Sequence, residues 1–128
     1  MSFPPTIAPV KVLLVPLQKD TRFASLLSQL ETRLDDEQIS FRVDQSGVSI
    51  GKRYSRNDEL GIPFGITVDY QSLEDNTFTL RDRDSTKQVR AGLDEILEAV
   101  GKMVKGKEAW EQVQGRLPAF EGKEDRED

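Results

Sequence analysis

The sequence predicts an α/β domain with a mixed, mostly parallel sheet: three parallel strands plus an antiparallel hairpin strand, flanked by three main helices. Strand-like and helix-like stretches follow one another in the order β-α-β-α-β-β-α, so helical crossovers come first. The last two strand-like stretches are joined by a connection too short for a crossover helix, which favours an antiparallel hairpin. With 128 residues, the chain is long enough for one domain with a single core.

The first half of the chain alternates strands with helices. The run "VKVLLV" is almost continuously apolar, as in a strand buried on both faces, and "ISFRV" has the two-residue alternation of a strand. Between them, apolar residues recur at helical spacing after Asp20 or Thr21, either of which can be the N-cap. Ser49 can cap a second helix, whose few apolar residues leave most of its surface, including Arg53 and Asn57, facing solvent or a partner. The predicted elements are a strand over residues 10–15, a helix over 21–34, a strand over 39–43 and a helix over 49–60.

The second half is predicted to hold the hairpin and a long helix. "IPFGITVDY" and "NTFTLR" alternate apolar with small or polar residues, and "QSLEDN" connects them. Ser85 is a natural N-cap for a helix whose apolar residues repeat at helical spacing as far as Met103. Trp110 and Val113 indicate one more short helix, which ends before Pro118. The predicted elements are strands over residues 62–70 and 76–81 and a helix over 85–103.

Composition divides the chain into three parts and excludes several functions. Residues 1–9 form a Pro-rich lead-in, residues 10–120 the domain, and residues 121–128 an acidic tail that we expect to be disordered. The chain has no Cys and no His, which excludes zinc fingers and histidine-based catalysis, so we expect no metal site and no catalytic residue. No signal peptide and no apolar run of membrane length is visible, so we expect an intracellular protein without a membrane partner. The net charge is −5, but residues 42–56 carry +3 and form a basic patch.

The segment "GVSIGKRY" follows a strand and opens a helix, which is the context of a phosphate-binding loop. Its spacing from Gly47 to Gly51 is one residue short of the P-loop pattern, and Arg53 stands where a Mg²⁺-binding hydroxyl is required. The helix N-terminus with Lys52, Arg53 and Arg56 can still bind RNA phosphates, or it can be a solvated helix face. Charge alone leaves both alternatives open.

The segment "LRDRDS" also allows two interpretations. In one, Asp82 or Asp84 lies near the start of the following helix, and Arg81 or Arg83 pairs with a neighbouring acid. In the other, strand alternation turns Arg81 to a face where its guanidinium can read or stack on an RNA base. Tyr70 can pack in the core like Tyr54, Phe64 and Phe78 or, because it lies at the end of a predicted strand, supply a stacking ring.

Two segments, "VDQSGVSIGKRYSRNDELGIPFGITVDY" and "TFTLRDRDSTKQVR", closely resemble the C-terminal anticodon-binding domain of eukaryotic-type glycyl-tRNA synthetases. The hallmark motifs are S-I-G-[RK]-R-Y-x-R-x-D-E-[IL]-G and T-L-R-D-R-D-S, and the resemblance resumes in "AWEQVQGRLPAFEG". It implies a domain that binds the anticodon stem-loop of glycine tRNA within a homodimeric class II synthetase. ATP and Mg²⁺ would be cofactors of a catalytic domain that nothing in these 128 residues resembles. The resemblance therefore implies a segment of a longer enzyme, cytoplasmic or also mitochondrial, with no cofactor and no activity of its own.

The resemblance also implies where RNA binds. In related domains the anticodon lies near the hairpin of the third and fourth strands and the adjoining helix end, and the arginines of the second helix are candidates for contacts to phosphates or the stem. Two other hypotheses remain: an interaction module of the same fold without anticodon specificity, and a stand-alone enzyme that uses a nucleotide through the near-miss loop. The implied RNA-binding residues are Arg53, Arg56, Asp69, Tyr70, Arg81 and Arg83.

Overall fold

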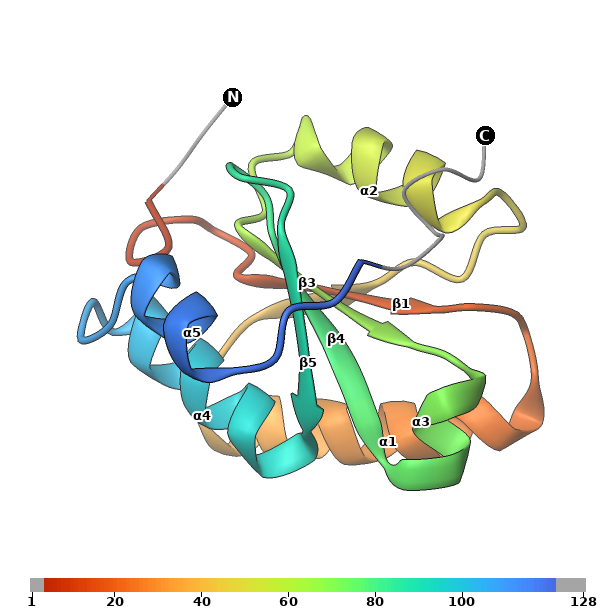
Figure 1. Ribbon diagram of the computed structural model, residues 1–128. Helices are drawn as coiled ribbons and strands as arrows, with labels where there is room; N and C mark the ends of the chain where they lie inside the picture. The colour runs from red at the N-terminus through yellow and green to blue at the C-terminus, as the bar shows by residue number, and fades with distance from the viewer. Residues whose placement is uncertain (1–3, 122–128) are drawn as a thin grey trace.

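Five strands form one mixed sheet in the computed structural model, which describes residues 4–121, and helices pack on both faces of this sheet (Figure 1). The strands are β1 (Val12–Pro16), β2 (Phe41–Val43), β3 (Phe64–Val68), β4 (Thr77–Asp82) and β5 (Gln88–Gly92). The helices are α1 (Thr21–Asp36), α2 (Ile50–Asp58), α3 (Tyr70–Asp75), α4 (Leu93–Val104) and α5 (Trp110–Arg116). The strand order is β2-β1-β3-β4-β5; β1 is parallel to β2 and β3, and the other two pairs are antiparallel. The predicted α/β class and its three parallel strands are confirmed.

The fifth strand lies where the sequence predicted the start of the long helix, so that part of the prediction is wrong. Ser85, the predicted N-cap, lies in the β4–β5 hairpin loop, where its main-chain N–H donates to a carboxylate oxygen of Asp82 at 2.9 Å. Val89 has helical spacing to Leu93, but it also alternates with polar residues on either side, as strand residues do. Pairing with β4 decides between the two patterns, because it satisfies the main chain of this segment and leaves Val89 fully buried.

The connection between β3 and β4 holds a short helix that the sequence did not predict, although the antiparallel pairing of these strands is confirmed. Asp69 caps this helix: its carboxylate accepts from the Ser72 main-chain N–H at 3.1 Å, and the Ser72 hydroxyl oxygen accepts from the Asp69 main-chain N–H at 3.1 Å. Asn76 ends the helix in the left-handed conformation, with φ 61°. As the first residue of α3, Tyr70 comes to the surface directly after β3.

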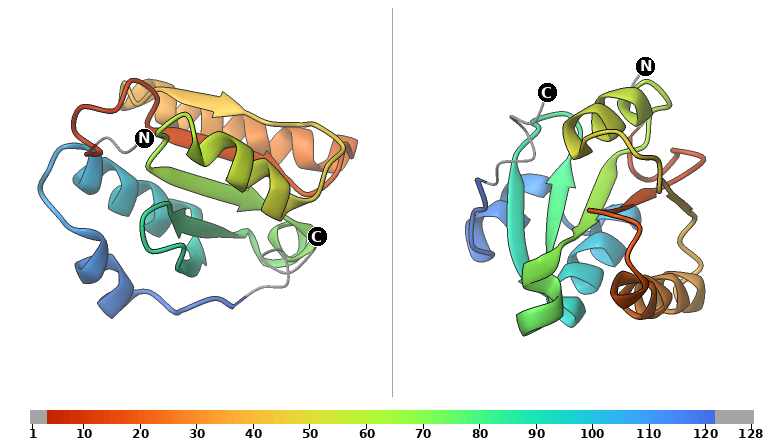
Figure 2. Two further views of the ribbon diagram at one scale, coloured as in Figure 1. Left: turned by 90° about the horizontal axis from the view of Figure 1, so that it is seen from above. Right: turned by 90° about the vertical axis from the view of Figure 1, so that its right-hand side faces the viewer.

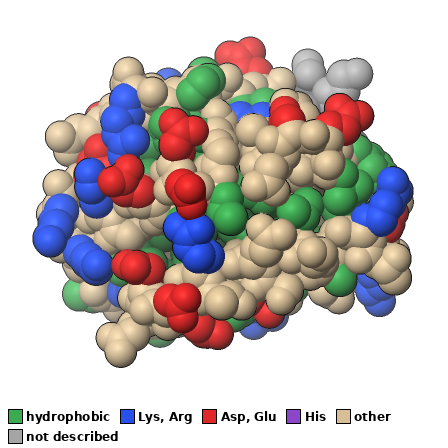
Figure 3. Space-filling model, turned by 90° about the horizontal axis from the view of Figure 1, so that it is seen from below, with side chains coloured by type: hydrophobic (Ala, Val, Ile, Leu, Met, Phe, Trp, Pro, Cys, Tyr) green, Lys and Arg blue, Asp and Glu red, His purple; other side chains and the backbone are tan. Residues whose placement is uncertain are grey.

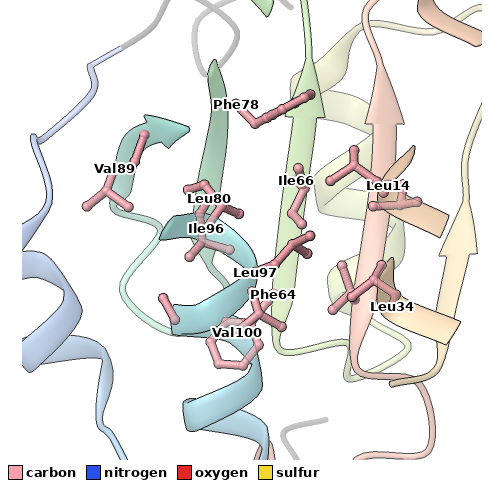
Figure 4. Packing of buried hydrophobic residues seen from close by; sticks show 14 of the residues in the cluster. Leu14, Leu34, Phe64, Ile66, Phe78, Leu80, Val89, Ile96, Leu97 and Val100 are labelled. Atoms are coloured by element: carbon pink, nitrogen blue, oxygen red, sulfur yellow. The ribbon is translucent and has the colours of Figure 1, made fainter. Parts of the chain in front are cut away.

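The main core lies between one face of the sheet and the helices α1, α4 and α5 (Figures 2 and 4). Its members come from four strands and all three helices, and Trp110 and Val113 of α5 pack inward as predicted. Removing a side chain from such a core costs about 2–5 kcal/mol, so this face accounts for much of the stability. The fully buried members labelled in Figure 4 include Leu14, Leu34, Ile66, Leu80, Val89, Ile96 and Val100.

The opposite face is covered by α2, which stands apart from the other helices in Figure 2. Ile50 and Tyr54 join Leu13 of β1 in a small second core. Arg53 and Asn57 are each only 2% exposed, so the prediction that they face solvent or a partner is wrong. They are buried because oxygen atoms beneath α2 accept hydrogen bonds from their side chains, a pattern that apolar spacing does not reveal.

The predicted domain of residues 10–120 contains every strand and helix of the described range. Ala119 forms an antiparallel bridge with Val89, which ties the end of that domain to β5. Seven of the eight tail residues, 122–128, lie outside the residues that the structure describes, as do residues 1–3 of the lead-in. Within residues 4–121, no helix is both long enough and apolar enough to cross a membrane.

Candidate functional site

The carboxyl ends of the three parallel strands meet at one edge of the sheet, and the segments that follow them form a polar surface. This edge is the usual place for ligands in parallel α/β sheets. A hollow of about 330 Å³ opens here, with Phe23 and Leu27 among its apolar lining residues and Gln18 and Gln45 among its polar ones. We call the exposed residues around it the strand-end surface: Gln18, Lys19, Arg22, Gln45, Arg56 and Tyr70.

Tyr70 is the large aromatic side chain of the strand-end surface, and it is 42% exposed. Its ring centroid lies 5.4 Å from that of Phe23, with the two rings tilted by 49°. The Arg22 guanidinium carbon lies 5.6 Å from the same ring centroid, and the Tyr70 hydroxyl donates to Oε1 of Gln18 at 2.9 Å. The ring is therefore held in one orientation while part of its surface stays open to a ligand.

Asp69, the residue before Tyr70, connects the start of α3 to β5. Besides capping α3, its carboxylate accepts two hydrogen bonds from the Arg90 guanidinium, at 2.7 and 2.9 Å. Burial raises the pKa of Asp69, but the hydrogen bonds and charge of Arg90, together with hydrogen bonds from Ser72, outweigh burial and keep that pKa below its ordinary value. Asp69 is thus an ionised, fully engaged carboxylate.

Arg53 lies beneath the strand-end surface and points inward. Its guanidinium donates to the main-chain carbonyl oxygens of Pro16 at 2.6 Å, Asp44 at 3.0 Å and Leu17 at 3.1 Å. These carbonyls belong to the ends of β1 and β2 and the residues after them, so Arg53 ties α2 to both strand ends. The three contacts turn this side chain away from the surface, where a phosphate would bind.

Arg56, one turn further along α2, is exposed and reaches the loop after β2. Its guanidinium donates to Asp44 at 2.8 Å and to the Ser46 hydroxyl at 2.7 Å. Burial raises the pKa of Asp44, but hydrogen bonds from Arg56, Ser46 and Asn57 lower it to about 2. Arg56 therefore fixes the loop that carries Gln45 and still presents its outer side to solvent.

Arg81 lies at the other end of the sheet, on β4. Its guanidinium donates to both carboxylate oxygens of Asp58, at 3.1 and 3.2 Å, and its central carbon lies 4.5 Å from the ring centroid of Tyr54. Only 7% of Arg81 is exposed. This pair fastens the end of α2 to β4.

Arg83 lies just beyond Arg81, in an acidic environment. Its guanidinium is 2.7 Å from an Asp84 carboxylate oxygen, and its side chain is 10% exposed. Burial raises the pKa of neighbouring Asp82, and the charges of Asp84 and Glu111 raise it further, against hydrogen bonds from Ser85. An environment that disfavours another negative charge is a poor place for a phosphate.

The structure does not bring together the four residues that the sequence placed at one hairpin. Antiparallel register sets Thr67 opposite Thr79 and Phe64 opposite Asp82, so Asp69 and Tyr70 lie beyond one end of β4 and the two arginines lie at its other end. The six residues of β4 span about 17 Å at a rise of about 3.4 Å per residue. Of the predicted residues, only Tyr70 and Arg56 lie on the strand-end surface.

The face formed by α1 and α4 also has a hollow, of about 380 Å³, but no aromatic side chain is among its lining residues, and its charged lining residues are both acidic and basic. Figure 3 shows acidic and basic side chains side by side there rather than a continuous basic patch. Ion pairs join the two helices, from Arg33 to Asp94 at 2.8 Å and from Lys105, just after α4, to Glu37, just after α1, at 3.5 Å. No group of metal ligands is present within residues 4–121 either.

Sequence reasoning missed Gln18, Lys19, Arg22 and Gln45. The available signal was their position: each follows the carboxyl end of a parallel strand, where such sheets bind ligands. Arg90 was missed for a different reason, because it was assigned to the predicted long helix instead of β5.

The chain matches the family model of the anticodon binding domain over residues 11–103. It is 48% identical over 120 residues to a putative glycine–tRNA ligase of Schizosaccharomyces pombe, and the match covers 94% of this chain and 18% of that protein. It is 47% identical over 120 residues to glycine–tRNA ligase 1, mitochondrial, of Saccharomyces cerevisiae, covering 94% of this chain and 17% of that protein. The chain thus spans less than a fifth of the length of these curated relatives.

A solved structure, that of prolyl-tRNA synthetase from Cryptosporidium parvum complexed with L-proline and AMP, has a similar fold. The TM-score is 0.75, with 83% of this chain and 23% of that chain covered. Because the sequence identity is 17%, this likeness shows the fold alone.

Proposed function

Since the chain belongs to the anticodon-binding domain family, we propose that it binds the anticodon stem-loop of glycine tRNA as the anticodon-binding domain of a glycine–tRNA ligase. The relatives that share almost half of its residues carry that enzyme name. The observation that carries the proposal is the half-exposed Tyr70 ring beside the side-chain amide of Gln18, at the strand ends where this fold offers a ligand site.

Tyr70 is the proposed stacking platform. Unpaired loop bases bind proteins by stacking on aromatic rings, and each such stack is worth about 1–3 kcal/mol. The Tyr70 ring is already oriented by Phe23, Arg22 and Gln18, so little conformational entropy is lost when a base covers it.

The amides and cations around Tyr70 are proposed to contact base edges and phosphates, respectively. Gln18 and Gln45 each carry two donors and an acceptor, the groups needed to read a base edge at the mouth of the hollow. Lys19 and Arg56 are exposed cations that fit phosphates, which set the register of the loop without reading its sequence.

The other four residues implied by the resemblance are proposed as framework rather than as RNA contacts. Arg53, Arg81 and Arg83 are mostly buried, and Asp69 is engaged by Ser72 and Arg90. In this assignment they fix the positions of α2, α3 and the β4–β5 hairpin, and the RNA contacts fall to the strand-end surface.

Catalysis is proposed to take place in another domain of a longer enzyme. ATP, Mg²⁺ and glycine would bind there, in a homodimeric class II synthetase, and this domain would contribute tRNA binding alone. The proposed location is the cytoplasm and also mitochondria, and the mitochondrial enzyme among the relatives supports the second of these.

The test is the affinity of the 128-residue chain for two short RNA hairpins, measured by fluorescence anisotropy. One hairpin carries the anticodon stem-loop of glycine tRNA, and the other carries the same stem with the second and third anticodon bases changed. We expect the changed hairpin to bind about tenfold more weakly or worse, because each lost base-edge contact costs about 1–3 kcal/mol. Equal affinities would contradict the proposal and favour an interaction module of the same fold.

A thermal melt with and without ATP tests the hypothesis of a stand-alone enzyme that uses a nucleotide. A nucleotide-using enzyme is stabilised by a ligand that binds its folded state, and the shift grows with ligand concentration. We expect no shift, because Arg53 at the near-miss loop is committed to main-chain carbonyls.

A further inference from the structure

A single guanidinium holds both ends of the segment that carries Tyr70. Arg90 on β5 donates through its Nη atoms to the two carboxylate oxygens of Asp69, which precedes α3. It also donates to the hydroxyl of Thr77 at 2.8 Å and the Thr77 carbonyl oxygen at 3.2 Å, which follow α3, and to the hydroxyl of Thr79 at 3.1 Å. All five N–H donors of Arg90 are thus used.

The other side of Arg90 is held by residues 117–120, which run beside β5. Its main-chain N–H donates to the Pro118 carbonyl oxygen at 2.9 Å, and the Phe120 main-chain N–H donates to the Gln88 carbonyl oxygen at 3.0 Å. The Phe120 ring centroid lies 5.3 Å from the guanidinium carbon. Arg90 is only 8% exposed, so it has almost no surface to offer a ligand.

We infer that Arg90 is a positioning residue for RNA recognition: without touching RNA, it fixes α3 against β4 and β5 and thereby sets the orientation of the Tyr70 ring. The inference rests on the proposed function, since it concerns the same surface. Its physical basis is that a six-residue helix is too short to be stable by itself, so the position of α3 depends on what anchors its ends. Because Arg90 connects both of those ends to one strand, the ring of Tyr70 is oriented before RNA arrives.

The molecule contains a matched control in Arg81. Both arginines lie on antiparallel strands, both are mostly buried, and both form a two-pronged pair with an aspartate. Arg81 differs in its place, at the opposite end of the sheet, and in using two donors rather than five. Lysine at either position keeps the charge but has three donors and no planar fork.

The experiment compares Arg90→Lys with Arg81→Lys, using the glycine anticodon hairpin with 2-aminopurine, a fluorescent base, at each loop position in turn. We expect Tyr70→Ala to weaken binding about tenfold and to reduce the quenching of one loop base, as loss of a stack should. Arg90→Lys should also weaken binding, by several-fold, and reduce the quenching of the same loop base. Arg81→Lys should leave the quenching unchanged. In the Tyr70→Ala background, Arg90→Lys should cost no further affinity, because the two substitutions act on one contact.

Equal effects of the two lysine variants on quenching would overturn the inference, and so would independent, additive losses in the double variant. Asp69→Asn is the second probe if Arg90→Lys folds poorly, since asparagine still caps a helix but cannot form the ion pair. It is expected to reproduce the loss of quenching.

A measurement without RNA separates this inference from the proposed function. Amide hydrogen exchange in α3 should be faster in Arg90→Lys than in Arg81→Lys, because the ends of that helix are released. Unchanged exchange would show that Arg90 does not hold α3. If exchange responds but wild type binds both hairpins equally, the anchor stands, the proposed function fails, and the recognition role of Arg90 fails with it.

Discussion

Replacement of Arg53 by methionine distinguishes a buried anchor from a phosphate contact. Methionine fills a similar volume but leaves the main-chain carbonyl oxygens of Pro16, Leu17 and Asp44 without the donor that now serves them. The exposed neighbour Lys52, in the same helix, provides the matched control through Lys52→Met. Both substitutions remove one positive charge and add the same side chain.

The expected loss of stability follows from the three acceptors. An unsatisfied buried acceptor costs about 1–3 kcal/mol, and relief of the desolvation of the guanidinium offsets part of the sum, which leaves about 3 kcal/mol. The entropy of unfolding is about 2.1 cal/mol/K per residue, so for this chain length the melting temperature should fall by about 11 °C. Lys52→Met should change the free energy of unfolding by less than about 0.5 kcal/mol.

Urea unfolding followed by circular dichroism gives the free energy, and RNA affinity measured over a range of salt concentration gives the number of phosphate contacts. If Arg53 is an anchor, Arg53→Met should lower the free energy of unfolding and leave the salt dependence of RNA binding as in wild type. A phosphate contact would behave in the opposite way: Arg53→Met would leave the urea midpoint unchanged and reduce the salt slope by about one. That second pattern would refute the role assigned to Arg53.

Three further predictions concern stability. Gly65→Ala should destabilise the fold by about 1–3 kcal/mol in urea unfolding, because a Cβ at this position would overlap the buried ring of Tyr54. Asp44 has a pKa of about 2 in the folded state, below its ordinary value, so about 2 kcal/mol of stability should be lost in acid melts as pH falls from about 4 towards 2, and Asp44→Asn should remove that loss. Asp82 has a raised pKa, so Asp82→Asn should raise or preserve the melting temperature at pH 7, and any gain should vanish below the ordinary pKa.

Each of these has a result that would count against it. Ala91→Gly, at a buried position of β5, is the control for backbone effects in Gly65→Ala. If Gly65→Ala leaves the urea midpoint unchanged, the Tyr54 ring moves aside freely and the prediction is wrong. An Asp44→Asn variant with the acid profile of wild type would assign that pH dependence to other groups. A fall in melting temperature for Asp82→Asn at pH 7 would show that the charge of Asp82 stabilises the hairpin loop.

Apolar spacing was enough to predict the fold class, because the other four strands of the sheet were recognised from their patterns even though β5 was not. β1 is a short, continuously apolar run that Pro16 ends, as expected of a buried strand, and α1 has five buried residues at helical spacing. The prediction missed β5 because the spacing of Val89 and Leu93 fits both the helical and the strand period, and only the pairing with β4 selects the strand. The prediction missed α3 because a helix of six residues is too short to show a helical repeat of apolar residues.

The site was harder to predict than the fold, because polar residues have no periodic signal. Arg53 sits among charged residues in a helix of low apolar content, so nothing local distinguishes it from exposed Lys52; its partners lie 9 to 37 residues away along the chain. The β3–β4 hairpin was predicted correctly, yet its residues were grouped as one site. In an antiparallel pair the turn lies at one end and the two outer strand ends lie together at the other, so Asp69 and Tyr70 beside the turn are a strand length away from Arg81 and Arg83.

The most direct test of the central claim, that bases are read at the strand-end surface, is to locate a crosslink. A glycine anticodon hairpin with 4-thiouridine in its loop is irradiated on the 128-residue chain, and the attached peptides are identified by mass spectrometry. The expected crosslinks fall on the loop after β1, the loop after β2 or the start of α3, around Gln18, Gln45 and Tyr70. Crosslinks confined to the β4–β5 hairpin around Arg83 would contradict the claim and return recognition to the opposite end of the sheet.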